Sequence, residues 1–261
     1  MIPHMAERKG WTHDELLLAM NLYCKLPFGQ LHRGNPEIIR LAAAMERTPS
    51  SLSMKLCNFA SFDPALQARG VKGLTGASRA DKAVWDEFHA DWETLGQQSE
   101  ALAEERTPHA PPALREIKPP AAPFDGPTEA QRTVRVRLAQ TFFRQTVLAS
   151  YACRCCITAN PVPQLLIASH ILPWGSHPKE RINPRNGLCL ARTHDAAFDA
   201  GLITLDEEWR LVLSKRLRDY LPNETLEENF NAYEGKAIQL PEKFQPDGDF
   251  MRRHREEVFA G

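Results

Sequence analysis

The stretch LLIASHILPWGSHPKERINPRNGLCLARTHDAAFDAG, residues 165–201, decides how the second half of the sequence is expected to fold. A hydrophobic run ends at Ser169-His170, and a Pro-Trp pair then opens a polar, basic loop. A second short apolar run follows Asn186, and an alanine-rich segment opens with Thr-His-Asp and ends at Gly201. Short apolar runs suit buried strands, threonine caps helices, and glycine ends them. This order predicts strand, long loop, strand and helix.

The predicted elements bring together the groups that metal-dependent phosphodiester cleavage requires. His170, at a strand end, is expected to face acidic and imidazole groups on the helix, with Asn186 on the loop between. A neutral imidazole can take a proton from water, and oxygen or nitrogen ligands can hold a divalent cation. Asp195 and Asp199 are four residues apart and share one helix face, whereas His194 points about 100° away. Either the two aspartates bind the cation, or His194 binds it while Asp195 orients it; Asp199 alternatively caps neighbouring backbone.

Three segments in this order, ASHILPW, RINPRNGLCL and HDAAFDAGLITLD, resemble the HNH endonuclease family, in its restriction-type and defence branch. The resemblance covers roughly residues 151–214 and implies a ββα-metal hairpin. It also implies hydrolysis of DNA that leaves 5′-phosphate and 3′-hydroxyl ends.

The resemblance assigns roles by position. His170 would be the general base, Asn186 would brace the loop, and His194-Asp195 would fall where the last histidine of the motif sits. Ser169 stands where many relatives carry a metal-binding Asp or His, so it would reach a metal through water. The expected cofactor is a single Mg2+ or Mn2+ ion, held by Asp195, His194 or Asp199, because an open site of mostly oxygen ligands suits these ions.

Six cysteines are present, and Cys153 and Cys156 have the Cys-x2-Cys spacing. A structural zinc needs four ligands, but only Cys189 lies near the place of a second pair. Reduced, packed thiols are therefore the prediction, and a structural zinc, completed by Cys189 and a histidine, is the less favoured alternative.

The first part of the chain, residues 1–95, predicts an all-helical domain. Thr12 and Glu15 form a capping box, and a second and third helix flank a tight turn at Arg47-Thr48-Pro49. This layout is that of a helix-turn-helix, and its polar side would contact DNA; the alternative is a plain helical hairpin with a solvated face. The residues predicted on this polar side are Ser51, Lys55 and Asn58. A further amphipathic helix is expected over residues 81–92.

Proline-rich residues 96–127 predict a linker that loosely tethers the helical domain to a nuclease domain, residues 128–261. That domain begins with a basic helix over residues 128–150, in which Arg132 and Arg135 are candidates to neutralise phosphates. Three arginines of the motif, Arg181, Arg185 and Arg192, are candidates to hold phosphates bidentately. Intramolecular ion pairs are the alternative for all of them.

Composition bounds the remaining possibilities. The 261 residues carry 32 Lys+Arg against 33 Asp+Glu, so any nucleic-acid surface must be local. No signal pattern or membrane-length apolar run is visible, which predicts a cytoplasmic protein without membrane contact. We therefore predict an α+β endonuclease that acts on double-stranded DNA, and a homodimer is compatible with it. The alternatives are a non-catalytic DNA-binding regulator with a degenerate HNH scaffold, and an RNA nuclease.

Overall fold

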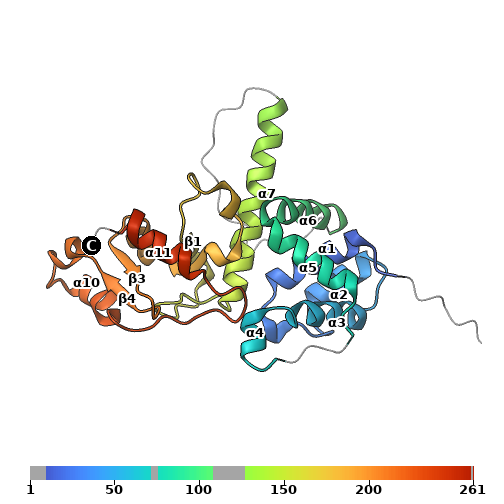
Figure 1. Cartoon of the computed structure of the whole chain (residues 1–261), viewed down its shortest axis with the longest axis horizontal. Helices are drawn as coiled ribbons and strands as arrows, with labels where there is room; N and C mark the ends of the chain where they lie inside the picture. Colours follow the sequence, from blue (N-terminus) through green and yellow to red (C-terminus); the bar gives the residue numbers. More distant parts are fainter. Residues whose placement is uncertain (1–9, 72–75, 108–126, 260) are drawn as a thin grey trace, which may run out of the picture.

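The computed structural model describes residues 10–71, 76–107, 127–259 and 261, with the backbone alone for residues 127–132. An all-helical half and a half with two small antiparallel sheets lie side by side, and the long helix α7 (Pro127–Ser150) lies between them (Figure 1). Helix α7 contacts helices of the first half and strands of the second. The predicted α+β fold is confirmed.

The first half is built of short helices whose ends the sequence marks clearly. Its elements are α1 (His13–Lys25), η1 (Phe28–Gln30), α2 (Pro36–Ala44), α3 (Pro49–Ala60), α4 (Pro64–Ala68), α5 (Arg79–Ala90) and α6 (Trp92–Arg106). The predicted capping box of Thr12 and Glu15 is present at α1. Thr48 caps α3, and Pro49 follows at the first helical position, where its missing N–H costs nothing.

The predicted polar face of α3 is wrong for two of its three residues. Lys55 Nζ donates to Asp81 Oδ1 over 2.7 Å, and Asn58 Nδ2 donates to Asp81 Oδ2 over 2.8 Å. Asn58 is buried, because α5 packs against this side of α3. Ser51 is half-buried, and its backbone N–H is bound by the hydroxyl of Thr48. The two helices and their turn are present as predicted, but Lys55 and Asn58 join helices to each other.

The predicted linker is helical at its beginning. The amphipathic helix expected over residues 81–92 breaks at Asp91, which caps α6, and α6 continues to Arg106. Gly96 is buried there, and a Cβ atom on it would lie 2.6 Å from Ile182 Cδ1. Residues 108–126 of the predicted linker lie outside the described residues. The domain boundaries at residues 95 and 128 stay predictions.

The second half contains a strand hairpin and helix in the predicted order, followed by a second hairpin. Its elements after α7 are η3 (Pro163–Leu165), β1 (Leu166–His170), η4 (Pro178–Glu180), η5 (Pro184–Asn186), β2 (Gly187–Ala191), α8 (Arg192–Asp199), β3 (Ile203–Leu205), β4 (Leu211–Leu213), α9 (Lys215–Arg218), α10 (Glu224–Asn229), η6 (Asn231–Tyr233) and α11 (Gly248–Glu257). Strand β1 pairs with β2 and β3 pairs with β4, both antiparallel.

A buried lysine joins the two halves directly. Lys243, with no exposed surface, donates to the carbonyls of Tyr23, Cys24 and Leu26 at the carboxyl end of α1, and its ammonium lies 4.2 Å from the Tyr23 ring centroid. The last carbonyls of a helix lack partners within it, and cations near them are stabilised by the helix dipole. The halves also share one cluster of buried apolar residues. They are packed together rather than loosely tethered.

Among the described residues, no helix has both the length and the apolar character needed to cross a membrane.

Candidate nuclease site

Strands β1 and β2 form a hairpin that is covered by α7 on one face and by α8 on the other. In the register, Ser169 lies opposite Leu188 and His170 lies opposite Gly187. Neighbouring residues of a strand point to opposite faces, so Ser169 and His170 belong to different sides of the hairpin. The α7 side is crowded at Gly187, because a Cβ atom there would lie 2.4 Å from Val147 Cγ2. Glycine is required by this close approach.

The α8 side carries the acidic groups. Burial raises the pKa of Asp195, while the buried hydroxyl of Ser169 and the charge of Arg192 oppose this shift. Burial and the neighbouring charge of Asp195 raise the pKa of Asp199 to about 6. Neither carboxylate is in an ion pair with a described residue, and Ser169 Oγ makes no hydrogen bond of ordinary geometry. The predicted pairing of Asp195 with Asp199 on one helix face, beside Ser169, is what the structure has.

His170 lies on the α7 side. Its ring stacks on Phe143 with centroids 3.9 Å apart and planes 11° apart, and Nε2 donates to the carbonyl of Arg181 over 2.8 Å. Burial lowers the pKa of His170 to about 4, against a smaller opposite effect of that carbonyl. The imidazole is therefore neutral, with Nδ1 as its acceptor atom. The expectation that His170 faces the acidic groups of the helix is wrong, because alternation along β1 gives that face to Ser169.

Asn186 braces the long loop between the strands. It has no exposed surface, its Oδ1 accepts from Leu172 N over 2.8 Å, and its Nδ2 donates to the carbonyls of Leu172 and Glu180. One side chain thus fixes both the beginning and the end of the loop. These contacts agree with the bracing position that the resemblance implies for Asn186.

The comparison with known families agrees with this arrangement. Residues 155–206, which include the hairpin, the loop and α8, match the model of the HNH endonuclease family. The chain carries an HNH endonuclease domain. No curated protein shows significant similarity to it. The match supports a nuclease-type function for the HNH domain.

His194, the other candidate ligand, is turned away from the carboxylates of the HNH domain. It is 1% exposed, its Nε2 donates to the carbonyl of Asn229 over 2.7 Å, and its ring packs on Phe230. Burial lowers the pKa of His194. Within the described residues, no group of three or more His, Cys, Asp and Glu side chains could hold a metal. The structure thus brings Asp195, Asp199 and Ser169 together and leaves His194 apart.

The arginines of the HNH motif all have intramolecular partners. Arg181 donates through Nε to the carbonyl of Trp174 and lies over the Trp174 ring, and Arg185 pairs with Asp247 at 2.9 Å. Arg192 donates through Nε to the carbonyl of Gln164 over 3.2 Å and is otherwise exposed. Of the three, Arg192 has the most freedom to bind a phosphate.

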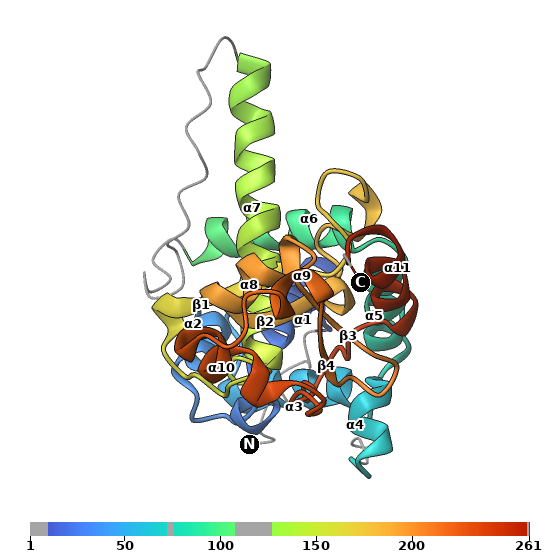
Figure 2. The ribbon, with the colours of Figure 1, turned by 90° about the vertical axis from the view of Figure 1, so that its left-hand side faces the viewer.

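On α7, Arg135 is exposed, whereas the side chain of Arg132 lies outside the described residues. Figure 2 shows the amino-terminal turns of α7 standing clear of the rest of the molecule. A phosphate contact by Arg135 is therefore sterically open.

The cysteines near the hairpin are reduced and packed. Cys155 Sγ accepts from Ala191 N over 3.3 Å, and Cys156 N donates to the carbonyl of Cys189 over 2.8 Å. Burial raises the pKa of Cys153, Cys156 and Cys189. These thiols are therefore protonated at neutral pH, which favours packing over metal binding.

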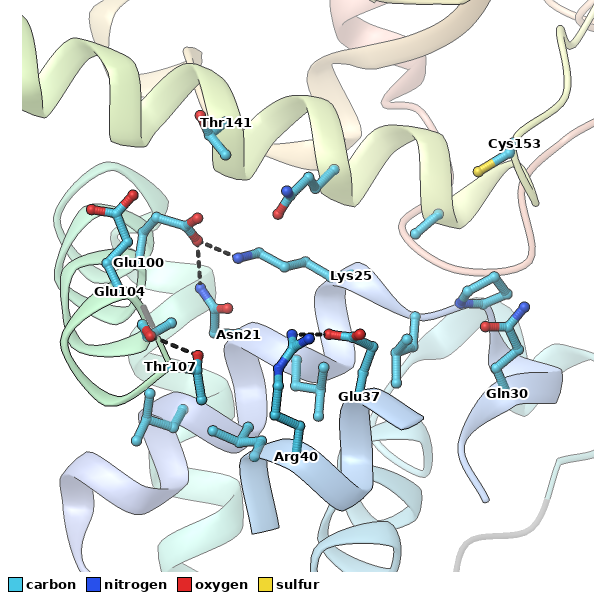
Figure 3. A pocket seen from close by; sticks show the side chains of 18 residues that line it. Asn21, Lys25, Gln30, Glu37, Arg40, Glu100, Glu104, Thr107, Thr141 and Cys153 are labelled. Atoms are coloured by element: carbon cyan, nitrogen blue, oxygen red, sulfur yellow. Dashed lines mark hydrogen bonds and ion pairs between the residues drawn. The ribbon is translucent and has the colours of Figure 1, made fainter. Parts of the chain in front are cut away.

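A cavity of about 390 Å³ lies away from the carboxylates, between α1, α2, α6 and α7. Figure 3 shows Asn21 and Lys25 pointing to Glu100 across it, and Arg40 paired with Glu37. Lys25 and Arg40, its two cations, are already paired, so they give no direct indication of a ligand.

Two residues that position the hairpin had no sequence signal of their own. Phe143 provides the surface on which His170 stacks, and Arg144 donates to the carbonyls of Leu166 and Pro163. The sequence alone does not indicate which ring Phe143 meets or which carbonyls Arg144 binds, because these partners come from other elements of the fold.

Proposed function

We propose that this protein is a metal-dependent endonuclease that hydrolyses phosphodiester bonds of double-stranded DNA, with residues 151–214 as its catalytic core. The observation that carries the proposal is the pair Asp195 and Asp199, two neighbouring carboxylates without ion-pair partners, within the segment that matches the HNH endonuclease family. Perturbed carboxylates of this kind gather at functional sites.

The residues present fit a divalent cation with hard oxygen ligands. Burial, and after it the neighbouring charge of Asp195, raise the pKa of Asp199, and the buried Ser169 Oγ makes no ordinary hydrogen bond. A cation bound there would offset the raised pKa of Asp199 and would give Ser169 Oγ an interaction partner. Carboxylates and a hydroxyl or water suit Mg2+ or Mn2+, which keep several waters, rather than zinc.

In this mechanism Asp195 and Asp199 would hold the ion, with Ser169 contributing through water. A bound Mg2+ or Mn2+ supplies charge stabilisation at the phosphate and at the departing oxygen. His170 takes a proton from the attacking water at Nδ1, because its Nε2 proton is held by the Arg181 carbonyl. Asn186 keeps the loop between β1 and β2, which contains Arg181, in place. Since His170 is the last residue of β1, we place the substrate across this end of the hairpin, where its two faces meet.

Contacts to the DNA backbone complete the proposal. Arg135 on α7 and Arg192 at the start of α8 are exposed cations on the nuclease half. Arg181, Arg185 and Ser51 remain proposed contacts that would have to exchange their present partners. Binding through several such cations should weaken steeply with salt.

One observation favours the alternative of a non-catalytic DNA-binding regulator. The pKa of His170 is lowered to about 4, and its stacking on Phe143 holds it on the face opposite the carboxylates. A general base is most effective with a pKa near the working pH. In that function, His170 would only support the hairpin.

Incubation with supercoiled plasmid in Mg2+ or Mn2+ separates the two functions. We expect nicking or linearisation by the wild type, and a loss of roughly a hundredfold or more in His170→Ala, since general-base loss costs about 10²–10⁴-fold. His177→Ala is the matched control, because His177 lies in the same loop and contacts Arg253 instead. Full activity in His170→Ala would remove His170 from the mechanism, and an inactive wild type would favour the regulator. A parallel incubation with RNA tests the remaining substrate class.

A role in restriction or defence is part of the proposal and rests on the resemblance of the motif. Plating of phage on cells that express the wild type or His170→Ala tests it, with protection expected from the wild type alone. Sedimentation of the purified protein tests the proposed homodimer.

A further inference from the structure

The loop between β1 and β2 holds His170 through its own backbone. His170 Nε2 donates to the Arg181 carbonyl over 2.8 Å, and the rings of His170 and Trp174 meet at 81° with centroids 5.4 Å apart. Arg181 in turn donates through Nε to the Trp174 carbonyl over 2.8 Å. The hydrogen bond at one imidazole nitrogen decides which nitrogen carries the proton. The position of Arg181 therefore sets the tautomer of His170.

Helix α6 of the all-helical half packs on this loop beside Arg181. It contacts η4, which ends one residue before Arg181. Ile182, on the other side of Arg181, has no exposed surface. A Cβ atom on Gly96 of α6 would lie 2.6 Å from Ile182 Cδ1, which is too close for either to stay in place. The backbone of α6 thus approaches the loop as closely as a glycine permits and limits where residues 178–182 can lie.

Glu93 lies three residues before Gly96, on the same face of α6. Its Oε1 accepts from Gln97 Nε2 over 2.5 Å, whereas Oε2 is buried and has no hydrogen-bond partner among the described residues. Burial raises the pKa of Glu93, and the charge of Arg181 opposes this shift. The carboxylate therefore feels the charge of Arg181, and their attraction draws the loop toward α6.

Apolar packing explains the contact at Gly96 but not the place of Glu93. Buried polar atoms without a partner are uncommon and cost free energy. A contact that only filled space would be served by an apolar residue at position 93. A carboxylate there has a purpose if its charge acts on Arg181, whose carbonyl binds His170.

We propose that Gly96 and Glu93 are positioning residues, through which α6 holds the loop so that the Arg181 carbonyl keeps His170 in the tautomer with its proton on Nε2. Nδ1 is then free to accept a proton. The catalytic use of that tautomer rests on the proposed nuclease function, whereas the positioning itself does not. The all-helical half would accordingly complete the cleavage site.

Two substitutions on α6 test the two contacts separately. Gly96→Ala pushes Ile182 away, although alanine favours the helix itself. Adding Ile182→Val removes the Cδ1 atom that the new Cβ meets, so the double variant should restore the loop. Glu93→Gln removes the charge and keeps the shape of the side chain. The matched controls are Gln98→Ala and Glu105→Gln, at exposed positions of the same helix.

The tautomer of His170 is read by nitrogen NMR of protein with labelled histidine, and its signals are identified by their absence in His170→Ala. We expect the Nε2–H form in the wild type and both controls, and a mixture with the Nδ1–H form in Gly96→Ala and Glu93→Gln. Plasmid cleavage should fall by roughly tenfold or more in kcat, because small misplacements of a reacting group are costly. Duplex affinity in EDTA should change little, and Ile182→Val should restore most of the loss in Gly96→Ala.

Unchanged His170 signals in folded Gly96→Ala and Glu93→Gln would overturn the proposal, and so would a cleavage loss that Ile182→Val does not restore. If Gly96→Ala fails to fold, Glu93→Gln decides alone. A wild type that does not cleave, with the expected change of tautomer in the variants, would refute the nuclease function and leave the positioning role intact.

Discussion

Two acidic sites of the molecule show opposite responses to burial. Burial alone would raise the pKa of Asp81, but hydrogen bonds from Lys55, the Ser78 backbone and Asn58 outweigh it, and the pKa is lowered. Burial raises the pKa of Asp195 and Asp199, and neither has an ion-pair partner. The comparison separates a carboxylate whose donors are all supplied by the fold from a pair that still lacks a counter-charge. The first holds helices together, and the second is suited to bind a cation.

The largest effect on stability is expected at Asp81, whose hydrogen-bond donors are all supplied by the fold. Asp81→Asn should destabilise the protein by about 3 kcal/mol, because it leaves the Lys55 ammonium largely buried without its charge partner. Urea unfolding measures this, and cleavage per folded molecule should stay unchanged. Asp86→Asn, which breaks an exposed pair with Lys82 on the same helix, is the control and should cost well under 1 kcal/mol. Equal losses of stability in Asp81→Asn and Asp86→Asn would contradict the special role of the buried Asp81 carboxylate.

The same reasoning applies to a buried cation. Lys243→Met keeps the length of the side chain but leaves the carbonyls of Tyr23 and Leu26 without their donor, so we expect a loss of about 2 kcal/mol. Lys236→Met, at an exposed position of the same segment, should have little effect. Thermal melting measures both. A separate, earlier transition of one half in Lys243→Met would show that this contact couples the halves.

The smallest effect on stability is expected at Asp199, which has no ion-pair partner, and this effect depends on pH. The folded-state pKa of Asp199, about 6, lies above its unfolded value, so this group binds protons in the folded state and stability falls as pH rises from about 4 to 6. Asp199→Asn should therefore melt a few degrees higher than the wild type above pH 6, with the gain vanishing below about pH 4. A gain that is independent of pH would contradict the raised pKa of the Asp199 carboxyl group as its cause.

The order of elements in the HNH domain could be predicted from the sequence because each signal is local. Apolar runs, Asn186 and the spacing of Asp195 and Asp199 fix strands, loop and helix face with no knowledge of the rest of the chain. The bracing role of Asn186 is implied by the resemblance to the HNH family rather than by a local signal. These features were predicted and are present.

The partners of the polar side chains could not be predicted, because they come from distant parts of the chain. Lys55 and Asn58 look solvent-facing within α3, and only the packing of α5 brings Asp81 to them. Lys243 reaches α1 from more than two hundred residues away. The predicted face of His170 is wrong for a different reason: strand alternation gives adjacent residues opposite sides, and α8 covers only one of these sides.

One titration tests the central claim that Asp195 and Asp199 form the cation site of a nuclease. Mn2+ is added to the wild type and to Asp195→Asn, bound ion is measured by electron paramagnetic resonance, and plasmid cleavage is followed in the same samples. We predict that ion uptake and cleavage rise together in the wild type and are both lost in Asp195→Asn, which stays folded. Cleavage that persists in EDTA, or Mn2+ uptake and cleavage that are unchanged in Asp195→Asn, would contradict the claim.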